Sequence, residues 1–340
     1  MFEYLMRRLI LMIPTLFGIT LVVFFIINLA PGSPIEQQIQ ALKFSGSADQ
    51  AQSSQSGATV SKEILDALNK QYGFDKPVYE RYWIWLKNLA TLDFGESFTY
   101  EEEVTEVIIS KFPVSLQFGI VSLILSYLIS IPLGVYKAVR SGSKLDYATS
   151  FLLFIAYAIP GFMLGILLIV FLAGGSFLDI FPIGGLYSDF YDEMNTWERI
   201  VDRIYHFILP TICYTIGSYT TLTFLMKNSL MEEIKKDYVR TARAKGLSEK
   251  VVYLKHALRN ALIPIVTGIG GFLGIFFAGS LLIEKVFQLD GIGLLGFNSI
   301  LSRDYNVIMG LVFIQALLML IGNIISDIAY VLVDPRIDFK

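Results

Sequence analysis

Hydrophobic residues in this chain gather in six long runs rather than in short alternating patterns. The runs cover residues 9–29, 113–136, 148–172, 207–226, 263–283 and 307–333. The first five contain no Asp, Glu, Lys or Arg, and the sixth contains only Asp327, near its end. A helix of about 20 apolar residues is long enough to cross a bilayer. The pattern therefore predicts an all-α integral membrane protein with six transmembrane helices.

Composition and cysteine content agree with this picture. Hydrophobic residues make up 54% of the 340 positions and charged residues 17%, whereas a typical soluble domain has about 25% charged residues. The chain has one cysteine, Cys213, inside an apolar run. No disulfide can form within the chain, and we expect Cys213 to pack as a small hydrophobic residue.

The first run admits a second interpretation, a cleaved signal peptide with Leu29-Ala30 near the cleavage site. It is longer than the apolar region of a signal peptide, about 7–15 residues, and five further runs follow it. We therefore expect a transmembrane helix at residues 1–30. Five prolines lie in or at the edges of the runs, and membrane helices tolerate proline because neighbouring groups satisfy the freed carbonyls. They are Pro14, Pro132, Pro160, Pro210 and Pro264.

Charges between the runs predict the orientation. The short segments 1–8, 137–147 and 227–262, with the C-terminal tail, hold 16 of the 27 lysines and arginines. Segment 173–206 instead has six acidic residues and two arginines. Basic residues close to transmembrane segments favour the cytoplasmic side. Both termini are therefore expected in the cytoplasm.

The segment after the first run is predicted to be a largely helical insertion outside the membrane. Residues 45–61 are rich in Ser, Gln, Gly and Ala, a composition typical of a flexible linker. A first helix is expected from Ser61 to about Gly73, and a second over VYERYWIWLKNLA. In the second helix, apolar residues recur at helical spacing and predict a packed or interfacial face, with partner contact as the alternative. These residues are Val78, Tyr82, Trp85 and Leu89.

Catalytic chemistry has no evident place in the sequence. There is no glycine-rich phosphate loop ending in Lys-Ser or Lys-Thr, and two histidines with one cysteine do not form a zinc motif. We therefore expect no cofactor, no metal and no nucleic acid on this chain. Gly270 and Gly274 form a G-x-x-x-G pair that favours close helix packing. The runs also lack the buried charges of a proton or ion relay, which makes a gradient-driven carrier the weaker interpretation.

The most informative polar segment lies between the fourth and fifth runs. Its first part has acidic residues early and basic residues late, the order that favours a helix. Gly246 is placed as the C-cap of that helix, in a left-handed conformation. Ser248 is placed as the cap of a second helix, over about 249–260. The segment is therefore predicted to form a short helix that lies across the inner surface of the membrane.

Two motifs in this segment resemble a known family. RTARAKG and HALRNALIP are similar to the EAA loop of bacterial ABC importer permeases, in the dipeptide/oligopeptide branch. Arg240-Thr241-Ala242 occupies the Glu-Ala-Ala positions, and Gly246 the glycine four residues after Ala242. The wider family has Leu-Pro about thirteen residues past that glycine. Here Leu258-Arg259 stands there and Pro264 comes later, which departs from the broad pattern but suits the peptide branch.

Further segments extend the resemblance over nearly the whole chain. They are MRRLILMIPTLFGIT, YGFDKPVYERYWIWLKNLATLDFGESF, FPIGG, VFQLDGIGLLGFNSILSRDYNVIMG and DPRIDF. Asp290 stands where many members have proline. That residue and the Gln/Ser-rich insertion are similar to the subgroup that handles oligopeptides and microcin C-like peptides.

The resemblance implies a type I ABC importer permease in the bacterial inner membrane. Such a permease forms half of a peptide pathway that works by alternating access. The implied partners are a second homologous permease, two cytoplasmic ATPase subunits that carry ATP and Mg, an extracytoplasmic solute-binding protein, the lipid bilayer and a peptide substrate. The alternatives from other classes are a stand-alone channel, a secondary carrier and, least favoured, a membrane enzyme.

The expected organisation follows from both lines of argument. It comprises a transmembrane helix at 1–30, an extracytoplasmic segment at 31–110, a permease core of five transmembrane helices at 111–333 with a cytoplasmic coupling loop at 227–262, and a cytoplasmic tail at 334–340. By resemblance, the residues that couple to the ATPase are Arg240, Thr241, Ala242, Arg243, Ala244, Lys245, Gly246, Leu247 and Ser248. No catalytic residue is assigned, and the substrate-binding residues are not identified.

Overall fold

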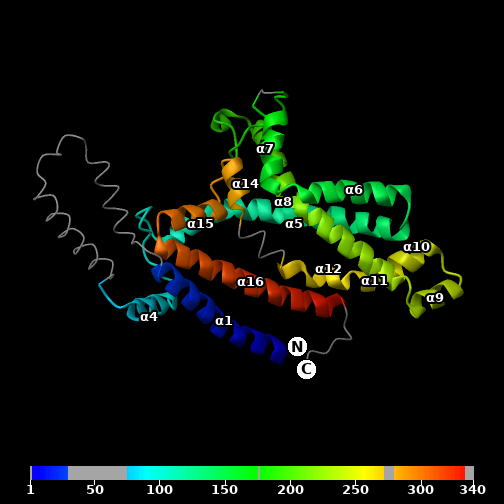
Figure 1. Cartoon of the computed structure of the whole chain (residues 1–340), viewed down its shortest axis with the longest axis horizontal. Coiled ribbons are helices and arrows are strands. Elements are labelled where there is room, and N and C mark those ends of the chain that lie inside the picture. Colours follow the sequence, from blue (N-terminus) through cyan, green and yellow to red (C-terminus); the bar gives the residue numbers. More distant parts are fainter. Residues whose placement is uncertain (1, 30–74, 175–176, 272–278, 334–340) are drawn as a thin grey trace, which may run out of the picture. The chain divides into compact units, whose positions relative to one another are not determined.

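The fold is helical throughout the described residues, as the sequence predicts. The computed structural model describes residues 2–29, 75–174, 177–271 and 279–333. Regular structure there consists of helices and two isolated bridges. The longer helices (Figure 1) are α1 (Phe2–Leu29), α4 (Val78–Leu89), α5 (Val104–Val139), α6 (Lys144–Ala158), α7 (Gly161–Leu172), α8 (Thr196–Glu233), α9 (Asp237–Ala244), α15 (Ile292–Leu301) and α16 (Tyr305–Val333). The shorter ones are a 3-10 turn (Tyr191–Glu193), α10 (Glu249–Val251), a π-helical turn (Val252–Ala257), α11 (Leu258–Ala261), α12 (Ile263–Thr267) and α14 (Leu281–Val286).

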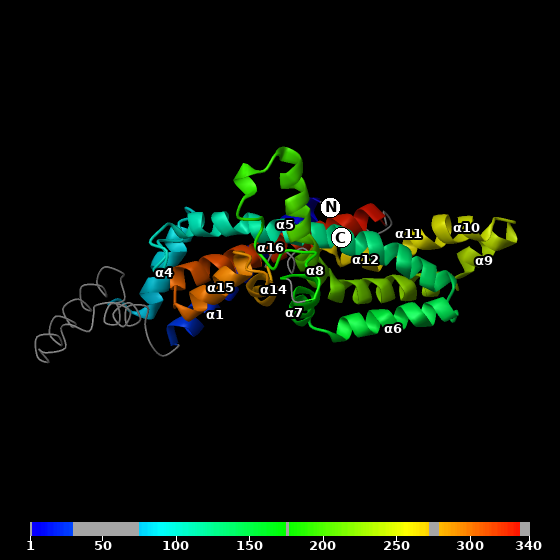
Figure 2. The ribbon, with the colours of Figure 1, turned by 90° about the horizontal axis from the view of Figure 1, so that it is seen from above.

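The chain divides into two compact units. Unit 1 comprises Met1–Ile10, Phe112–Leu294 and Leu317–Lys340, and unit 2 comprises Leu11–Lys111 and Leu295–Ala316. Within unit 1, α8 is the helix on which α6, α7, α11 and α12 pack. In both ribbon views α6 lies beside α8 (Figures 1 and 2). Long α8 therefore connects the loop that follows it to the other helices of unit 1.

The helices long and apolar enough to cross a membrane are fewer than the six predicted runs. Among the described residues, α1, α5 and α16 qualify, and the pair α6–α7 adds a fourth if it is counted as one span. The fourth predicted run, 207–226, lies inside α8, whose many serines and threonines leave it less apolar. The fifth run, 263–283, includes residues outside the described part. The count of six spans therefore stays a prediction.

The third predicted run, 148–172, is not one continuous helix. Its two parts, α6 and α7, meet at an angle of 96°. Between them Ile159 has an extended backbone (φ −90°, ψ 118°) and Pro160 follows at the start of α7. Proline disfavours a helical residue before it and has no N–H to continue the hydrogen-bond ladder. Pro160 therefore interrupts the helix of this run, and the run is at most one broken span.

In unit 2 the predicted aromatic face of α4 packs inside the protein. Tyr82 and Trp85 are buried. The Tyr82 hydroxyl lies 3.1 Å from the Thr20 hydroxyl of α1, and its ring is 5.2 Å from that of Phe24. Packing therefore accounts for this face, as the sequence favours. The predicted linker at 45–61 and the helix expected before Gly73 lie outside the described residues.

Two further predictions concern small residues of unit 1. Cys213 is free and 3% exposed, in a cluster with Phe118, Leu209 and Phe287. It packs as a small hydrophobic residue, as predicted. Gly270 lies against Gly322 of α16, and its N–H donates to the Ser326 hydroxyl at 2.7 Å. Close packing at Gly270 is confirmed, whereas Gly274 lies outside the described residues.

Gly270→Ala is expected to destabilise the protein. Its methyl group would lie 1.8 Å from the carbonyl oxygen of Gly322, so the backbone must move. Overpacking of this kind costs about 1–3 kcal/mol. The measurement is the Tm of the purified protein in detergent. Gly271→Ala is the matched control because its methyl group would meet no heavy atom within 4 Å. Equal Tm values for the two variants would contradict the close packing.

Candidate coupling site

The predicted coupling loop begins while the chain is still in α8. That helix runs to Glu233, so the first residues of 227–262 are helical and continuous with the packed part of unit 1. A short turn then leads to α9. The Glu233 carboxylate accepts hydrogen bonds from the side chains of Lys236 and Tyr238, which fixes the turn. Burial raises the pKa of Tyr238 to about 12, and the neighbouring Glu233 adds to this shift. The Tyr238 hydroxyl therefore stays protonated and remains a donor.

Gly246 ends the first loop helix in the predicted way. Its φ is +79°, in the left-handed region that favours glycine. Its N–H donates to the carbonyl oxygen of Arg243 at 2.9 Å. A side chain at this position would meet no heavy atom within 4 Å, so the glycine is needed for its backbone and not for lack of space.

The second loop helix spans 249–261, close to the predicted 249–260. Ser248 occupies its N-cap position, but its side chain makes no capping hydrogen bond. The middle of the helix, Val252–Ala257, is a π-helical turn, a widened turn that is frequent at functional sites. The Ser229 hydroxyl of α8 donates to the carbonyl oxygen of Ala261 at 2.8 Å. This bond ties the end of the second helix back to α8.

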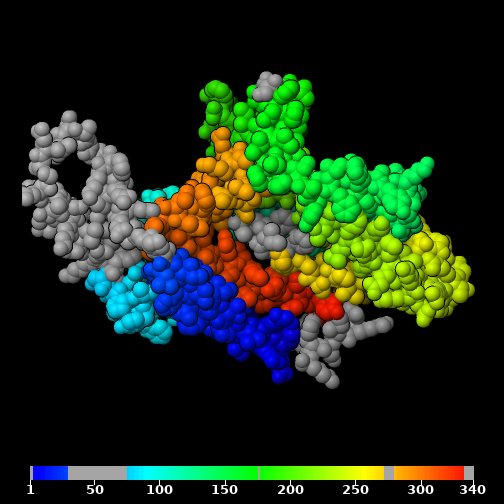
Figure 3. Space-filling view, in the orientation of Figure 1, coloured from blue at the N-terminus to red at the C-terminus, as the bar shows by residue number. Residues whose placement is uncertain are grey.

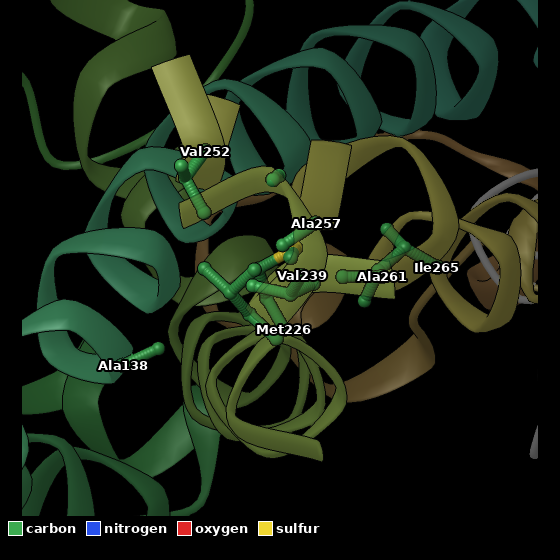
Figure 4. Close-up of a cluster of buried hydrophobic side chains, with 9 residues drawn as sticks. Ala138, Met226, Val239, Val252, Ala257, Ala261 and Ile265 are labelled. Carbon is green, nitrogen blue, oxygen red and sulfur yellow. The ribbon is translucent and has the colours of Figure 1, made fainter. Parts of the chain in front are cut away.

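A buried apolar cluster attaches both loop helices to α8 (Figure 4). Its members include Met226 and Leu230 of α8, Val239 and Ala242 of α9, and Val252, Ala257, Ala261 and Ile265 beyond the loop's turn. Because several of these side chains have no exposed surface, the two loop helices are expected to move together with α8. Ala242 is 6% exposed and packs into this cluster. Ala242, one of the nine predicted coupling residues, therefore faces the cluster and not the exposed surface of the loop.

Most of the predicted coupling residues lie on the exposed surface of the loop, whose atoms are yellow-green in Figure 3. Of the nine predicted coupling residues, those exposed are Arg240, Thr241, Ala244, Lys245, Gly246, Leu247 and Ser248. Apolar side chains lie exposed beside them: Leu247, Val251 and Leu254 are 39%, 37% and 47% exposed. The exposed face therefore combines basic and apolar side chains, a composition suited to contact with the surface of another protein.

Arg243, the remaining residue of the predicted coupling set, is half-buried and holds the turn together. Its Nε donates to Glu249 at 2.9 Å, and its guanidinium lies 5.6 Å from the centre of the Tyr253 ring. Hydrogen bonds from Tyr253 and Arg243 lower the pKa of Glu249. The ion pair thus bridges the two loop helices across Gly246.

A buried group of charges near this loop was not predicted from the sequence. The Lys137 side chain has no exposed surface, and its Nζ lies 3.0 Å from Asp146 Oδ1. It also donates to the hydroxyls of Thr149 and Ser150, at 2.7 and 2.8 Å. Lys227 of α8 donates to both Asp146 oxygens, at 2.9 and 2.8 Å.

The absence of charges was predicted within the apolar runs, and these three charged residues lie just outside the runs. Lys137 and Lys227 each stand one residue past the end of a run, and Asp146 two residues before the next. Because α5 and α8 continue past the ends of these runs, the side chains of Lys137 and Lys227 lie in the interior between packed helices. A signal for this group was present in the sequence, because basic and acidic residues both lie within two residues of the ends of apolar runs.

Comparison with known proteins decides the family. The family model described as binding-protein-dependent transport system inner membrane component matches residues 130–339. The chain belongs to this family. It is therefore a multi-pass inner-membrane subunit of a transport system that also uses a substrate-binding protein and an ATPase, and it is not itself an enzyme.

Similar proteins cover the chain from end to end. The permease is 45% identical to the peptidoglycan transport system permease YejB of Agrobacterium fabrum, over 99% of this chain and 98% of that protein. It is 44% identical to the inner membrane ABC transporter permease YejB of Escherichia coli O157:H7, over 99% of each. It is 38% identical to the oligopeptide transport system permease AppB of Bacillus subtilis, over 100% of each. The ABC permease resemblance seen in the sequence is thus confirmed, and a stand-alone channel or secondary carrier is not favoured.

Proposed function

We propose that this permease forms half of the pathway of an ATP-driven importer for oligopeptides or peptide-like compounds. The observation that carries the proposal is similarity over the full length to a permease named for oligopeptide transport. Other similar permeases are named for peptidoglycan and dipeptide transport. The pathway opens by alternating access, outward to the loaded binding protein and inward after the ATPase rearranges. Transport of microcin C-like peptides stays a prediction within this proposal.

The proposed partners complete the machine. A second homologous permease supplies the other half of the pathway, and two cytoplasmic ATPase subunits carry ATP and Mg. No cofactor is proposed for this chain. The exposed face of residues 240–248 docks into a groove of one ATPase subunit. The basic and apolar character of this face supports such a contact, and the buried cluster behind it supports the transmission of movement to α8.

We further propose that both termini and the coupling loop face the cytoplasm, with residues 31–112, 173–206 and 286–306 outside. The sorting of basic and acidic segments supports this orientation.

One variant tests docking and orientation together. Ser248→Cys in a Cys213→Ala background places a single thiol on the exposed face of the loop. We expect a membrane-impermeant thiol reagent to label it in inside-out vesicles but not in intact cells or right-side-out vesicles. We also expect a short cross-linker to join it to an ATPase subunit. Cys213→Ala alone is the control for background labelling. Labelling from the outside would refute the orientation, and cross-linking only to lipid or to no protein would refute the docking.

A further inference from the structure

A pocket of about 380 Å³ opens at the break between α6 and α7. Its lining comes from the break itself, from the middle of α8 and from the start of α14. The break follows the 15 residues of α6 and precedes the 12 residues of α7, so it lies near the middle of this candidate span. The volume is within the range of pockets that hold small ligands, about 300–1,000 Å³.

The break provides main-chain groups that a continuous helix would use internally. Because Pro160 has no N–H, the carbonyl of Ala156 lacks its usual helical donor. The first hydrogen bond of α7 runs from the N–H of Leu164 to the carbonyl of Pro160. The N–H groups before Leu164 in α7 therefore have no acceptor within that helix. Non-helical backbone at membrane depth is tolerated where it is buried in protein or lines a water-filled cavity, and the residues of this break line the pocket. Interrupted helices hold substrates in several transporter folds.

The side chains of the pocket are neutral, and two of its hydroxyls are available. No residue of its lining carries a charge. The Tyr214 hydroxyl is occupied, because it donates to Glu284 at 3.2 Å and accepts from the N–H of Ser280 at 3.1 Å. The hydroxyls of Ser218 and Ser280 make no hydrogen bond to the described part of the chain. The pocket thus offers neutral hydrogen-bonding groups among apolar walls, and no counter-ion for a charged ligand end.

Two glycines define the shape of this pocket. A side chain at Gly161 would lie 2.6 Å from the carbonyl oxygen of Cys213, so this glycine lets α7 begin directly against α8. Gly217, one helical turn after Cys213, lines the pocket, and a side chain there would meet no heavy atom within 4 Å. Gly217 therefore serves no close contact in unit 1. A larger side chain at this lining position is expected to reduce the volume of the pocket.

We propose that this pocket holds the main chain of the transported peptide as it passes through this half of the pathway. The proposal rests on peptide import as the function of the permease. Peptide N–H and C=O groups match the neutral donors and acceptors of the break and of the two serine hydroxyls. Recognition of the main chain, without a charged side chain in the pocket, gives a site that accepts peptides of differing sequence.

The test uses the complete transporter with its binding protein, reconstituted in proteoliposomes. Gly217→Leu fills the pocket, and we expect the rate of uptake of a labelled oligopeptide to fall about tenfold or more. Subunit composition of the purified complex is measured alongside, so that a failure to assemble is distinguished from a loss of uptake. Gly18→Leu is the matched control, because it adds the same side chain to a helix at a position that is also open within 4 Å. Uptake at the normal rate by Gly217→Leu would overturn the proposal.

A second comparison removes hydrogen bonds instead of space. Replacing Ser218 and Ser280 together by alanine is expected to raise the KM for uptake several-fold, with little change in maximal rate. A peptide with N-methylated main-chain groups, which cannot donate, is expected to show a smaller difference between the two complexes. Equal KM values would overturn the proposal even if Gly217→Leu failed to assemble. A complex with native sequence that imports no peptide would instead refute the proposed function, so the two failures are distinguishable.

Discussion

Lys137→Met is expected to destabilise the protein by about 3 kcal/mol. Removal of one partner from a buried ion pair costs about 3–5 kcal/mol, because the other charge stays buried without compensation. Asp146 keeps its contacts with Lys227 in this variant, which places the effect at the low end of that range. The hydroxyls of Thr149 and Ser150 also lose their donor. The measurement is the Tm in detergent, with membrane abundance as the second readout.

The matched control for this variant is Lys144→Met. Lys144 is at the first position of α6, two residues before Asp146, and its side chain is exposed. Exposed substitutions of this kind usually change stability by less than about 0.5 kcal/mol. If Lys137→Met left the Tm as high as the control does, the buried ion group would be unimportant to the fold.

Gly246→Val is expected to abolish transport while the permease remains inserted in the membrane. A β-branched residue held at φ +79° is strained by about 1–3 kcal/mol. That cost is well below the total stability of a typical folded protein, about 5–15 kcal/mol. The chain therefore stays folded, but the turn between the two loop helices relaxes to another conformation. Docking of the ATPase subunit is expected to weaken by about tenfold or more.

Gly142→Val separates backbone strain from the loss of coupling. Gly142 also has a positive φ, of +81°, and a side chain there would also meet no heavy atom within 4 Å. It lies in the turn between α5 and α6, outside the proposed docking face. We expect this variant to keep ATPase co-purification and peptide uptake near the normal level. If both variants transported normally at normal abundance, the loop would serve only to orient the protein in the membrane.

Local sequence signals predicted part of the backbone of the proposed coupling loop. Gly246 ended the first loop helix because its position after a run of basic residues is typical of a left-handed C-cap, and the backbone there is left-handed. Whether the Ala242 side chain is exposed or buried could not be predicted from the sequence. Small residues suit both a docking surface and a crowded interior, and only the packing of α9 on α8 distinguishes the two.

For the membrane helices too, the sequence predicted features that depend on local composition, but not those that depend on tertiary packing. Apolar runs located α1, α5 and α16 because a long apolar helix needs no other information. The 96° bend at Pro160 was not predicted, because a proline in a span can be accommodated or can break the helix, and neighbouring packing decides which. The burial of Lys137 and Asp146 was missed for a related reason. The end of an apolar run predicts the end of the buried segment. Helix α5, however, continues beyond the end of its run, and Lys137 in this continuation is buried in the protein interior.

The measurement that tests the account most directly is peptide uptake by the reconstituted transporter. Proteoliposomes would contain this permease with its second permease and ATPase subunits, and the binding protein and a labelled oligopeptide would be added outside. The account predicts uptake that requires enclosed ATP and Mg, and that stops when any one partner is omitted. It also predicts no uptake by this chain alone under an imposed proton gradient. Uptake by the single chain driven by that gradient would contradict the account.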